Sequence, residues 1–229
     1  MTNGSVAATV RETTFLQGHN AMKDESKSAG PDEGDAALAV SPRVRELLEV
    51  GARVFAEKGY DAATMRDVSD ASGVSKALLY HHFDSKDNFY AQIAFNSSQN
   101  LYDYVFDAIP AEATAAEKVH AYMIATATFF MEHRWAWIAA STAFWNDPDR
   151  HRLEARLKRR KEFEYLLRDL IREGVENGEF NDVDPAMTGR IILSSINWMH
   201  RWYNPEKTMT PPEIVDAYFG IILKGLDKR

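Results

Sequence analysis

Helix start and stop signals follow one another at short intervals between residues 41 and 87 and limit this stretch to short helices joined by tight turns. Ser41 followed by Pro42 is typical of a helix N-cap and first helical position, and Gly59 ends the helix that they begin. Between these signals, apolar residues and one glycine recur at the spacing of a single helix face. That face contains Val44, Leu47, Leu48, Gly51, Val54 and Phe55.

A second helix of about two turns is predicted next. Thr64 and Asp67 have the spacing of a capping box, with Asp in place of the commoner Glu at the third helical position. Gly73 ends this helix, because glycine readily adopts the left-handed conformation of a helix end. The expected apolar face consists of Met65, Val68 and Ala71.

A third short helix begins directly after the turn. Ser75 is its N-cap, and Val74 with Leu79 has the spacing of a hydrophobic staple; Ser85 then caps a fourth helix. Three helices with a glycine-containing turn between the second and the third form a helix-turn-helix, whose last helix can lie in the DNA major groove.

The residues of this window closely resemble the DNA-binding domain of TetR-family transcriptional regulators. The resemblance covers about residues 43–95, and we expect the DNA-binding domain to span residues 41–95. It is carried by Thr64, Gly73-Val74-Ser75-Lys76, Leu79-Tyr80-His81-His82-Phe83 and Ser85-Lys86.

The resemblance implies that Thr64 and Lys86 contact DNA phosphates from helix N-termini, where free N–H groups and the helix dipole favour anions. Tyr80 and His81 are further candidates for phosphate contacts, which position a protein without reading sequence. Base edges are expected to meet the exposed start of the third helix, with Arg66 nearby. The residues there are Ser75, Lys76, Ala77 and Leu78.

Charge is distributed unevenly along the chain, whose formal net charge is -7. Residues 1–40 show no helical or strand period and hold three basic against six acidic residues, so we expect a disordered tail that does not bind DNA. Residues 74–83, in contrast, contain Lys76, His81 and His82 and no acidic residue. The third helix is therefore the predicted DNA-binding surface.

The remaining chain also has helical patterns, so the predicted fold class is all-α. The TetR resemblance implies that residues 96–229 bind a small effector and dimerise through the last two helices as a four-helix bundle. Helices are expected from Ser85 to before Pro110, from Thr114, over Trp135–Trp145, from Asp147-Pro148 to Gly174 or Gly178, from Asp184-Pro185 to about Tyr203, and from Thr210 to about Leu226.

The last two of these helices have wide apolar faces. We expect them to meet a second copy of the chain in a homodimer, which would place two recognition helices on a palindromic operator. The alternative is that a single chain buries these faces internally. The candidate dimerisation residues are Ile192, Met199, Trp202, Tyr218 and Ile222.

Aromatic residues are abundant outside the DNA-binding window and suggest an apolar effector pocket, although core packing is the favoured alternative for each aromatic taken singly. Residues 194–208 resemble a TetR subgroup that responds to acyl-CoA thioesters, and Arg134, His200 and Arg201 would supply cations for the CoA phosphates. A free hydrophobic or aromatic ligand is the alternative. The candidate ligand-binding residues are Tyr122, Phe130, Trp137, Phe144, Trp145, Trp198 and Arg201.

A basic run extends from Arg150 to Lys161, in which seven cationic side chains accompany one acid, Glu154. We interpret it as a solvated helix face paired with Glu162 and Glu164. The alternatives are a site for an anionic ligand and a second contact with DNA.

The sequence holds no signal for enzymatic chemistry. It contains no cysteine and none of the nucleophile-elbow, zincin, phosphate-loop or dinucleotide-binding motifs, and the adjacent His81 and His82 diverge on a helix and cannot chelate one metal ion. We expect no metal, no cofactor, no membrane segment and no secretory signal, and a cytoplasmic location. The sequence thus predicts a ligand-responsive regulator, with repression as the favoured mode, that binds double-stranded DNA as a homodimer; an all-α enzyme or carrier for a hydrophobic molecule is the alternative.

Overall fold

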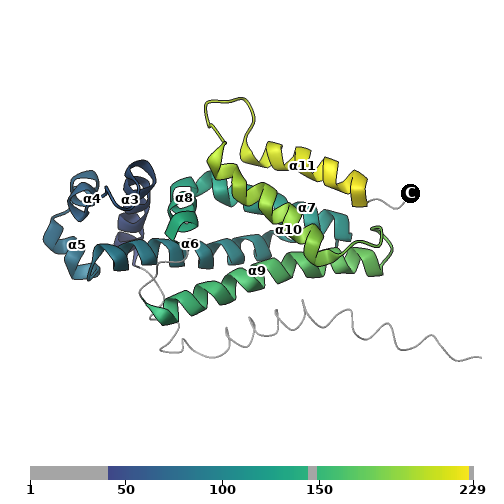
Figure 1. The fold of residues 1–229 in the computed structure, drawn as a ribbon, viewed down its shortest axis with the longest axis horizontal. Coiled ribbons are helices and arrows are strands. Elements are labelled where there is room, and N and C mark those ends of the chain that lie inside the picture. The colour runs from purple at the N-terminus through teal and green to yellow at the C-terminus, as the bar shows by residue number, and fades with distance from the viewer. Residues whose placement is uncertain (1–40, 144–148, 227–229) are drawn as a thin grey trace, which may run out of the picture. The chain divides into compact units, whose positions relative to one another are not determined.

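The structure is a computed structural model that describes residues 41–143 and 149–226. Regular structure in these two ranges is helical, as predicted (Figure 1). The elements are α3 (Pro42–Lys58), α4 (Met65–Ser72), α5 (Lys76–His82), α6 (Lys86–Ala108), α7 (Ala115–Glu132), α8 (Arg134–Ala143), α9 (Arg150–Glu176), α10 (Pro185–Asn197), the 3₁₀ turn η1 (Trp198–Arg201) and α11 (Pro211–Leu226).

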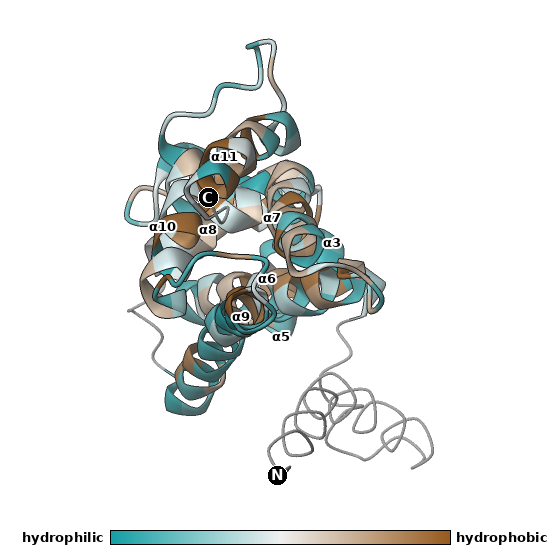
Figure 2. Ribbon diagram, turned by 90° about the vertical axis from the view of Figure 1, so that its right-hand side faces the viewer, coloured by the Kyte–Doolittle hydropathy of each residue, from teal (hydrophilic) through white to brown (hydrophobic). Residues whose placement is uncertain are grey.

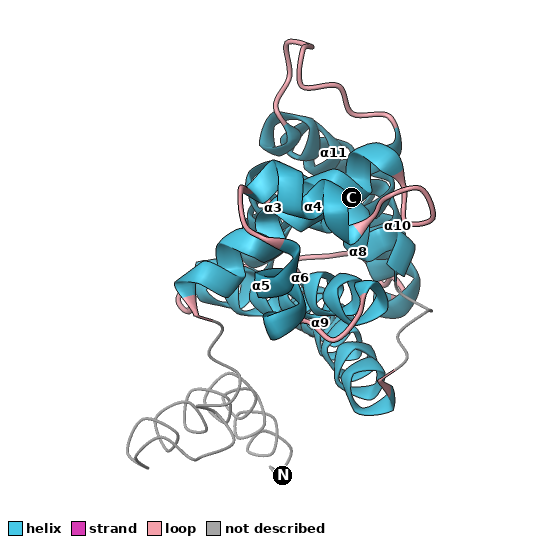
Figure 3. Cartoon of the chain, turned by 90° about the vertical axis from the view of Figure 1, so that its left-hand side faces the viewer, coloured by secondary structure: helices cyan, strands magenta, loops and turns pink. Residues whose placement is uncertain are grey.

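The chain from Val44 onward packs as one unit, whereas residues 1–40, the predicted tail, lie outside the described residues. Within this unit α3, α4 and α5 gather at one end, and α7, α10 and α11 lie at the other (Figures 1 and 3). The long helix α6 connects the two ends and packs against α7, α8 and α9. Because α6 continues without a break past residue 95, the two functional regions share a rigid element.

Side-chain caps begin the helices where the sequence placed them. Thr64 and Thr114 each form a complete capping box, with Asp67 and Glu117 as the third helical residues. The side chains of Ser75, Ser85 and Asp184 accept hydrogen bonds from first-turn N–H groups of α5, α6 and α10. These caps satisfy N–H groups that a helix start otherwise leaves without a partner.

The start of α9 differs from the predicted one, and its end is the later of the two predicted alternatives. Helix α9 begins at Arg150 with Asp149 as its N-cap, while Asp147 and Pro148 lie outside the described residues. It runs through Gly174, whose missing side chain makes room for the Phe180 ring: a Cβ there would stand 2.3 Å from that ring. The chain leaves the helix only after Asn177, where Gly178 has φ of 73°.

The segment after Pro185 is not one helix to Tyr203. Helix α10 ends at Asn197 and continues as η1, which winds more tightly, so Met199 is buried while Trp198 is exposed. A smaller difference concerns α4, where Met65 and Val68 are buried but Ala71, in the last turn, is exposed.

The core that joins α3 and α5 to α6 is aromatic. Phe89 is fully buried and its ring lies on the backbone of Gly51, where a Cβ would stand 2.3 Å away. Phe83 packs on the same ring at a centroid distance of 4.4 Å. Burial of these rings anchors α3 and α5 to the first turns of α6.

Helix α9 has two different halves. Its first turns are largely hydrophilic where they extend below the other helices in Figure 2, and its second half buries Leu166, Leu167, Leu170 and Ile171 against α7 and α10. None of the helices in residues 41–143 and 149–226 has the length and apolar character needed to cross a bilayer.

Candidate DNA interface and ligand cavity

Helix α5 is fixed to the protein by its apolar side. Val74 and Leu79 are buried, as the predicted staple requires, and Phe83 at the helix end is buried as well. The Ser75 hydroxyl accepts a hydrogen bond from the Leu78 N–H at 3.2 Å. The helix has only two turns, so these anchors determine which side faces outward.

The outward side of α5 contains the residues predicted to meet DNA. Ser75, Lys76, Ala77, Tyr80 and His81 are exposed, and Leu78 is half-buried. The Lys76 ammonium stands 5.6 Å from the centroid of the Tyr80 ring. The cation and the phenol are thereby presented together on a face that the described chain leaves open.

The start of α4 is organised around Asp67. Its carboxylate accepts hydrogen bonds from the Thr64 N–H at 2.8 Å and the Thr64 hydroxyl at 2.7 Å, and it pairs with the Lys58 ammonium at 2.6 Å. The hydrogen bond from Lys58, followed by those from Thr64, lowers the pKa of Asp67 to about 2. The Thr64 hydroxyl already serves the capping box, so a phosphate at this helix start would share it. Arg66, in the same first turn, is exposed, and its Nε lies 3.8 Å from Asp70 Oδ2.

Lys86 is held in place at the start of α6. Its ammonium stands 4.3 Å from the centroid of the Tyr60 ring and donates a hydrogen bond to the Asp61 carbonyl at 3.3 Å. The Tyr60 hydroxyl in turn donates to Asp87. Burial, followed by this hydrogen bond, raises the pKa of Tyr60, which therefore stays a donor. The lysine is thus positioned by the loop between α3 and α4.

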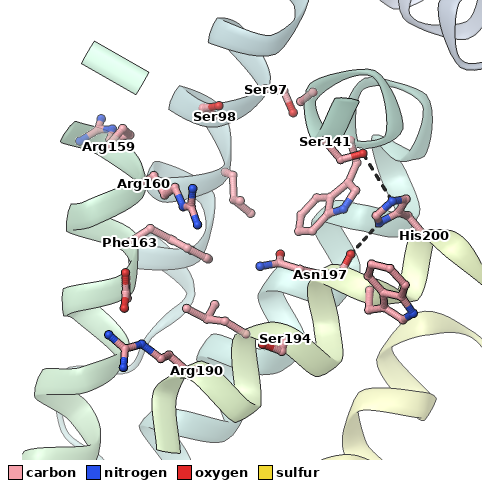
Figure 4. Close-up of a pocket in the computed structure, with 16 residues that line it drawn as sticks. Ser97, Ser98, Ser141, Arg159, Arg160, Phe163, Arg190, Ser194, Asn197 and His200 are labelled. Atoms are coloured by element: carbon pink, nitrogen blue, oxygen red, sulfur yellow. Dashed lines mark hydrogen bonds between the residues drawn. The ribbon is translucent and has the colours of Figure 1, made fainter. Parts of the chain in front are cut away.

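A cavity of about 920 Å³ lies in the other region of the unit, lined by residues of α6, α8, α9, α10 and η1. Arg159 and Arg160 of α9 and Arg190 of α10 stand along one side, and Ser141 and His200 lie across from them (Figure 4). The apolar part of the lining consists of Leu101, Trp137, Ala140, Phe163, Leu193 and Trp198.

The cationic side of the cavity is held by ion pairs and by an aromatic ring. The Arg159 guanidinium binds Asp103 at 3.0 Å and Glu162 at 3.2 Å, and it lies 4.4 Å from the centroid of the Tyr102 ring. Burial raises the pKa of the Tyr102 phenol, although the nearby guanidinium opposes this shift. Arg159 is therefore preorganised rather than free to swing.

Across the cavity, His200 joins η1 to α8. Its Nδ1 lies 2.6 Å from the Asn197 carbonyl oxygen, and its Nε2 lies 3.5 Å from the Ser141 hydroxyl (Figure 4). Since both ring nitrogens face polar groups, the imidazole is oriented along the cavity wall.

The predicted ligand-binding residues divide into three groups. Trp137 and Trp198 line the cavity. Tyr122 and Phe130 do not: both are fully buried core residues, and the Tyr122 hydroxyl donates to the Phe163 carbonyl at 3.0 Å. Arg201 lies outside the cavity, over the Trp198 ring at 5.3 Å. Phe144 and Trp145 lie outside the described residues.

The sequence could not separate Tyr122 and Phe130 from cavity residues, because a helical stripe of aromatics marks a buried face without showing whether that face meets protein or a ligand. Arg134 is likewise displaced from its predicted role, because its guanidinium stacks over Trp135 at 5.1 Å and Tyr203 at 6.0 Å instead of lining the cavity. Of the three predicted cations, His200 is the one that the cavity lining includes.

The basic run was interpreted correctly only in part. Arg150 and Lys158 are exposed and lie within 4 Å of Glu154 and Glu162, as a solvated helix face requires. Arg159 and Arg160 instead line the cavity, and Arg156 is fully buried. Glu164, the acidic residue of the cavity lining, pairs with Arg168. The clustering of seven cations was the available signal for these cavity residues, but Arg190 stands alone in the sequence and had none.

The predicted dimerisation residues also fall into two groups, one buried and one at least partly exposed. Ile192 and Met199 are fully buried within the chain and cannot form a surface, because α10 packs against α7 and α9 and η1 packs against α8. Trp202 is exposed, and Tyr218 and Ile222 are half-buried. The most exposed apolar side chains of α10 and α11 are Ile191 and Ile221, at 59% and 69% of full exposure.

A helix-turn-helix held by the first turns of a long helix, with a ligand-sized cavity beside the middle of that helix, defines a transcriptional regulator. Residues 47–93 match bacterial regulatory proteins of the tetR family, and residues 112–226 match the tetracyclin repressor-like C-terminal domain. The chain belongs to the TetR family.

Relatives and solved structures agree with this assignment. The chain is 28% identical over 195 residues to the HTH-type transcriptional repressor KstR2 of Mycobacterium tuberculosis, covering 83% of this chain and 96% of the relative. The structure of the TetR family regulator PfmR from Thermus thermophilus is 34% identical with a TM-score of 0.73, over 80% of this chain and 99% of the other. AibR in complex with isovaleryl coenzyme A and operator DNA shares the fold, at 22% identity and a TM-score of 0.67, over 78% of this chain and 97% of that one. These proteins are regulators, so the alternative of an all-α enzyme is set aside.

Proposed function

We propose that the protein is a homodimeric repressor that binds a palindromic operator in the cytoplasm and leaves it when an anionic, partly apolar effector occupies the cavity. The observation that carries this proposal is the pairing of the outward face of α5 with a cavity whose lining combines three arginines and an apolar wall. Helix α6 connects the two.

On DNA, the residues at the start of α5 are assigned to the bases. Lys76 suits guanine O6 or N7, and the Ala77 methyl suits the thymine methyl group. Ser75 and Leu78 complete this edge, with Arg66 close by. The phosphate contacts are assigned to Thr64, Tyr80, His81 and Lys86, which are supported by exposure or by their place at a helix start.

The dimer is assigned to α10 and α11, within an effector-binding and dimerisation region that spans residues 96–229. Trp202, Tyr218 and Ile222 remain candidates, and the exposed Ile191 and Ile221 replace the two buried residues. Water-exposed apolar side chains on two neighbouring helices favour association with a second copy. A dimer would hold two copies of α5 at the spacing of successive major grooves.

The effector is assigned to the acyl-CoA thioesters. Arginine binds phosphate in a bidentate geometry, and three such side chains beside an apolar wall suit a ligand with an anionic head and an acyl tail. The cavity volume of about 920 Å³ is at the upper end of the usual range for ligand sites. The complex of AibR with isovaleryl coenzyme A and operator DNA shows that this fold accommodates such a ligand in that protein.

The experiment is fluorescence anisotropy with DNA from upstream of the protein's own gene, measured with and without a panel of acyl-CoAs and the matching free acids. We expect tight, salt-dependent binding that one thioester releases and its free acid does not. By linkage, the DNA must weaken thioester binding by the same factor. Binding that no thioester releases would contradict the effector class, and binding to no upstream fragment would contradict the DNA assignment.

A further inference from the structure

The second turn of α6 contains a buried contact with a helix that lines the cavity. The Tyr90 hydroxyl donates a hydrogen bond of 3.0 Å to the Ala139 carbonyl oxygen of α8. Three other residues of that short helix, Trp137, Ala140 and Ser141, line the cavity. The hydrogen bond therefore joins the DNA-binding end of α6 to the helix that a cavity ligand would touch.

The ring of Tyr90 continues the contact toward the DNA interface. It lies edge-on to Phe55 of α3 at 4.8 Å and against Tyr60 at 4.7 Å, measured between ring centroids. Tyr60 is the residue whose ring supports the Lys86 ammonium at 4.3 Å and whose hydroxyl donates to Asp87. A series of direct contacts thus runs from α8 through two phenols to the lysine assigned to phosphate.

Each step in this series is short and directional. A hydroxyl hydrogen bond depends on both distance and angle. A shift of the Ala139 carbonyl therefore changes the position of the Tyr90 ring that keeps this bond. A movement of the Tyr90 ring displaces the rings packed against it, because protein interiors have few voids that could absorb the movement. Another contact between α3 and α8, Arg53 over Trp135 at 5.9 Å, is longer and involves an exposed guanidinium, so it constrains the two helices less.

We propose that Tyr90 and Tyr60 are positioning residues that couple α8 to Lys86, so that displacement of the cavity wall moves the lysine away from the DNA phosphate. The inference rests on the proposed function, since it takes Lys86 as a phosphate contact and the cavity as the effector site. It adds the route by which one site acts on the other. Coupling of this kind is reciprocal, so DNA on the interface must also stabilise α8.

The reciprocal effect permits a test without any effector. Hydrogen–deuterium exchange of the full chain is measured by mass spectrometry with and without a duplex that the protein selects from a random DNA pool. In the wild type we expect DNA to slow exchange in α5 and also in residues 134–143, by about fivefold or more in the latter, the lower range of allosteric coupling. In Tyr90→Phe, exchange in α5 should still slow, while exchange in residues 134–143 should not.

Tyr122→Phe is the matched control. It also removes a buried tyrosine hydroxyl that donates to a backbone carbonyl at 3.0 Å, but its partner is Phe163 and its helices are α7 and α9. We expect residues 134–143 of this variant to respond to DNA as in the wild type, although both variants lose similar stability. If Tyr90→Phe does not fold, Tyr60→Leu interrupts the same series of contacts at its outer end. At a DNA concentration high enough to saturate this variant, it should give the same loss.

The results separate the inference from the function on which it rests. Slower exchange in α5 with no change in residues 134–143 of the wild type would overturn the coupling, as would an equal response in Tyr90→Phe. Loss of DNA binding by a folded Tyr90→Phe protein would also overturn it, because Tyr90 would then be a part of the interface. Failure of any duplex to slow exchange in wild-type α5 would instead contradict the DNA-binding function.

Discussion

The DNA interface and the cavity are assembled in opposite ways. The candidate DNA contacts come from one segment, residues 64–86, and lie on the outside of two short helices and the start of a third. The cavity takes its lining from positions as far apart as Ser97 and His200, brought together by five elements. A short exposed segment can contact a large partner such as DNA, whereas a small molecule is enclosed only when side chains from several elements surround it.

The same difference determines which side chains are constrained. On α5, the buried anchors are apolar and the predicted DNA contacts are on the outward side. Each of these contact residues can therefore be changed with little effect on the fold. In the cavity, Arg159 is held by Asp103, Glu162 and the Tyr102 ring, so function and structure depend on the same side chain. Variants that act on one region and spare the other can test this contrast.

The largest effect is expected from the two phenylalanines that lie on helical glycines, Phe89 on Gly51 and Phe180 on Gly174. Phe89→Ala and Phe180→Ala should each lower the free energy of unfolding by about 3–5 kcal/mol, because both leave a cavity in a packed core. In urea titrations the two variants should lose similar free energy of unfolding, but only Phe89→Ala should also weaken DNA binding. Equal loss of DNA affinity in both would show that the regions are not separable.

The second effect concerns the cavity alone. Arg190→Gln should weaken binding of the releasing thioester by about 10- to 100-fold, since a charge-assisted hydrogen bond contributes about 1.5–3 kcal/mol. Isothermal titration calorimetry measures this loss, and DNA affinity without thioester should not change. Arg150→Gln is the control, because Arg150 is exposed on α9 away from the cavity. An equal loss in both variants would indicate a general charge effect and contradict the assigned cavity.

Within the DNA interface, two lysines should differ. Lys76→Ala should lower the preference for the operator over random DNA by about 1–3 kcal/mol, because it removes a base contact. Lys86→Ala should weaken both complexes alike and reduce the slope of log K against log salt by about 0.9. Anisotropy titrations at several salt concentrations distinguish these outcomes, and equal effects of Lys76→Ala on both DNAs would refute its assignment.

A smaller effect is expected at the two capping boxes. Thr64→Ala and Thr114→Ala should each cost about 1 kcal/mol, which corresponds to a decrease in melting temperature of about 2–4 °C for a chain of this size. Thr64→Ala should also lower DNA affinity, since it loosens the start of α4. If Thr114→Ala lowers DNA affinity by the same amount, stability and not local geometry governs binding.

The smallest effect is the pH dependence of the Asp67 cap. Lys58 and Thr64 lower the pKa of this carboxyl from 3.8 to about 2, so the folded state favours the ionised form. The resulting stabilisation is fully present above pH 3.8 and is lost as the pH falls through 2. Thermal unfolding of the wild type and Asp67→Asn should therefore differ at about pH 5 and converge toward about pH 2. A difference that stays constant over this range would contradict the role of the charge.

Local features of the sequence were sufficient for the DNA-binding region. Caps at Thr64, Ser75 and Ser85, the staple of Val74 with Leu79 and the glycine turn all act within a few residues, so their positions in the chain specify the geometry. The apolar faces of the later helices were also recognisable. Their ends were less so: Gly174 stays inside α9, where the Phe180 ring packs against its backbone, and the helix ends just before Gly178.

The sequence by itself determined an all-α chain, its helix-turn-helix and the outward residues of α5, because helix caps and apolar periods depend on neighbours along the chain. Tertiary structure alone decided that Tyr122 and Phe130 are core residues, that Ile192 and Met199 face inward, and that three arginines meet across α9 and α10. The physical reason is that an apolar or cationic side chain has the same local signature whether it faces a neighbouring helix, a partner or a cavity. Only the packing of the helices determines which of these three surroundings a side chain faces.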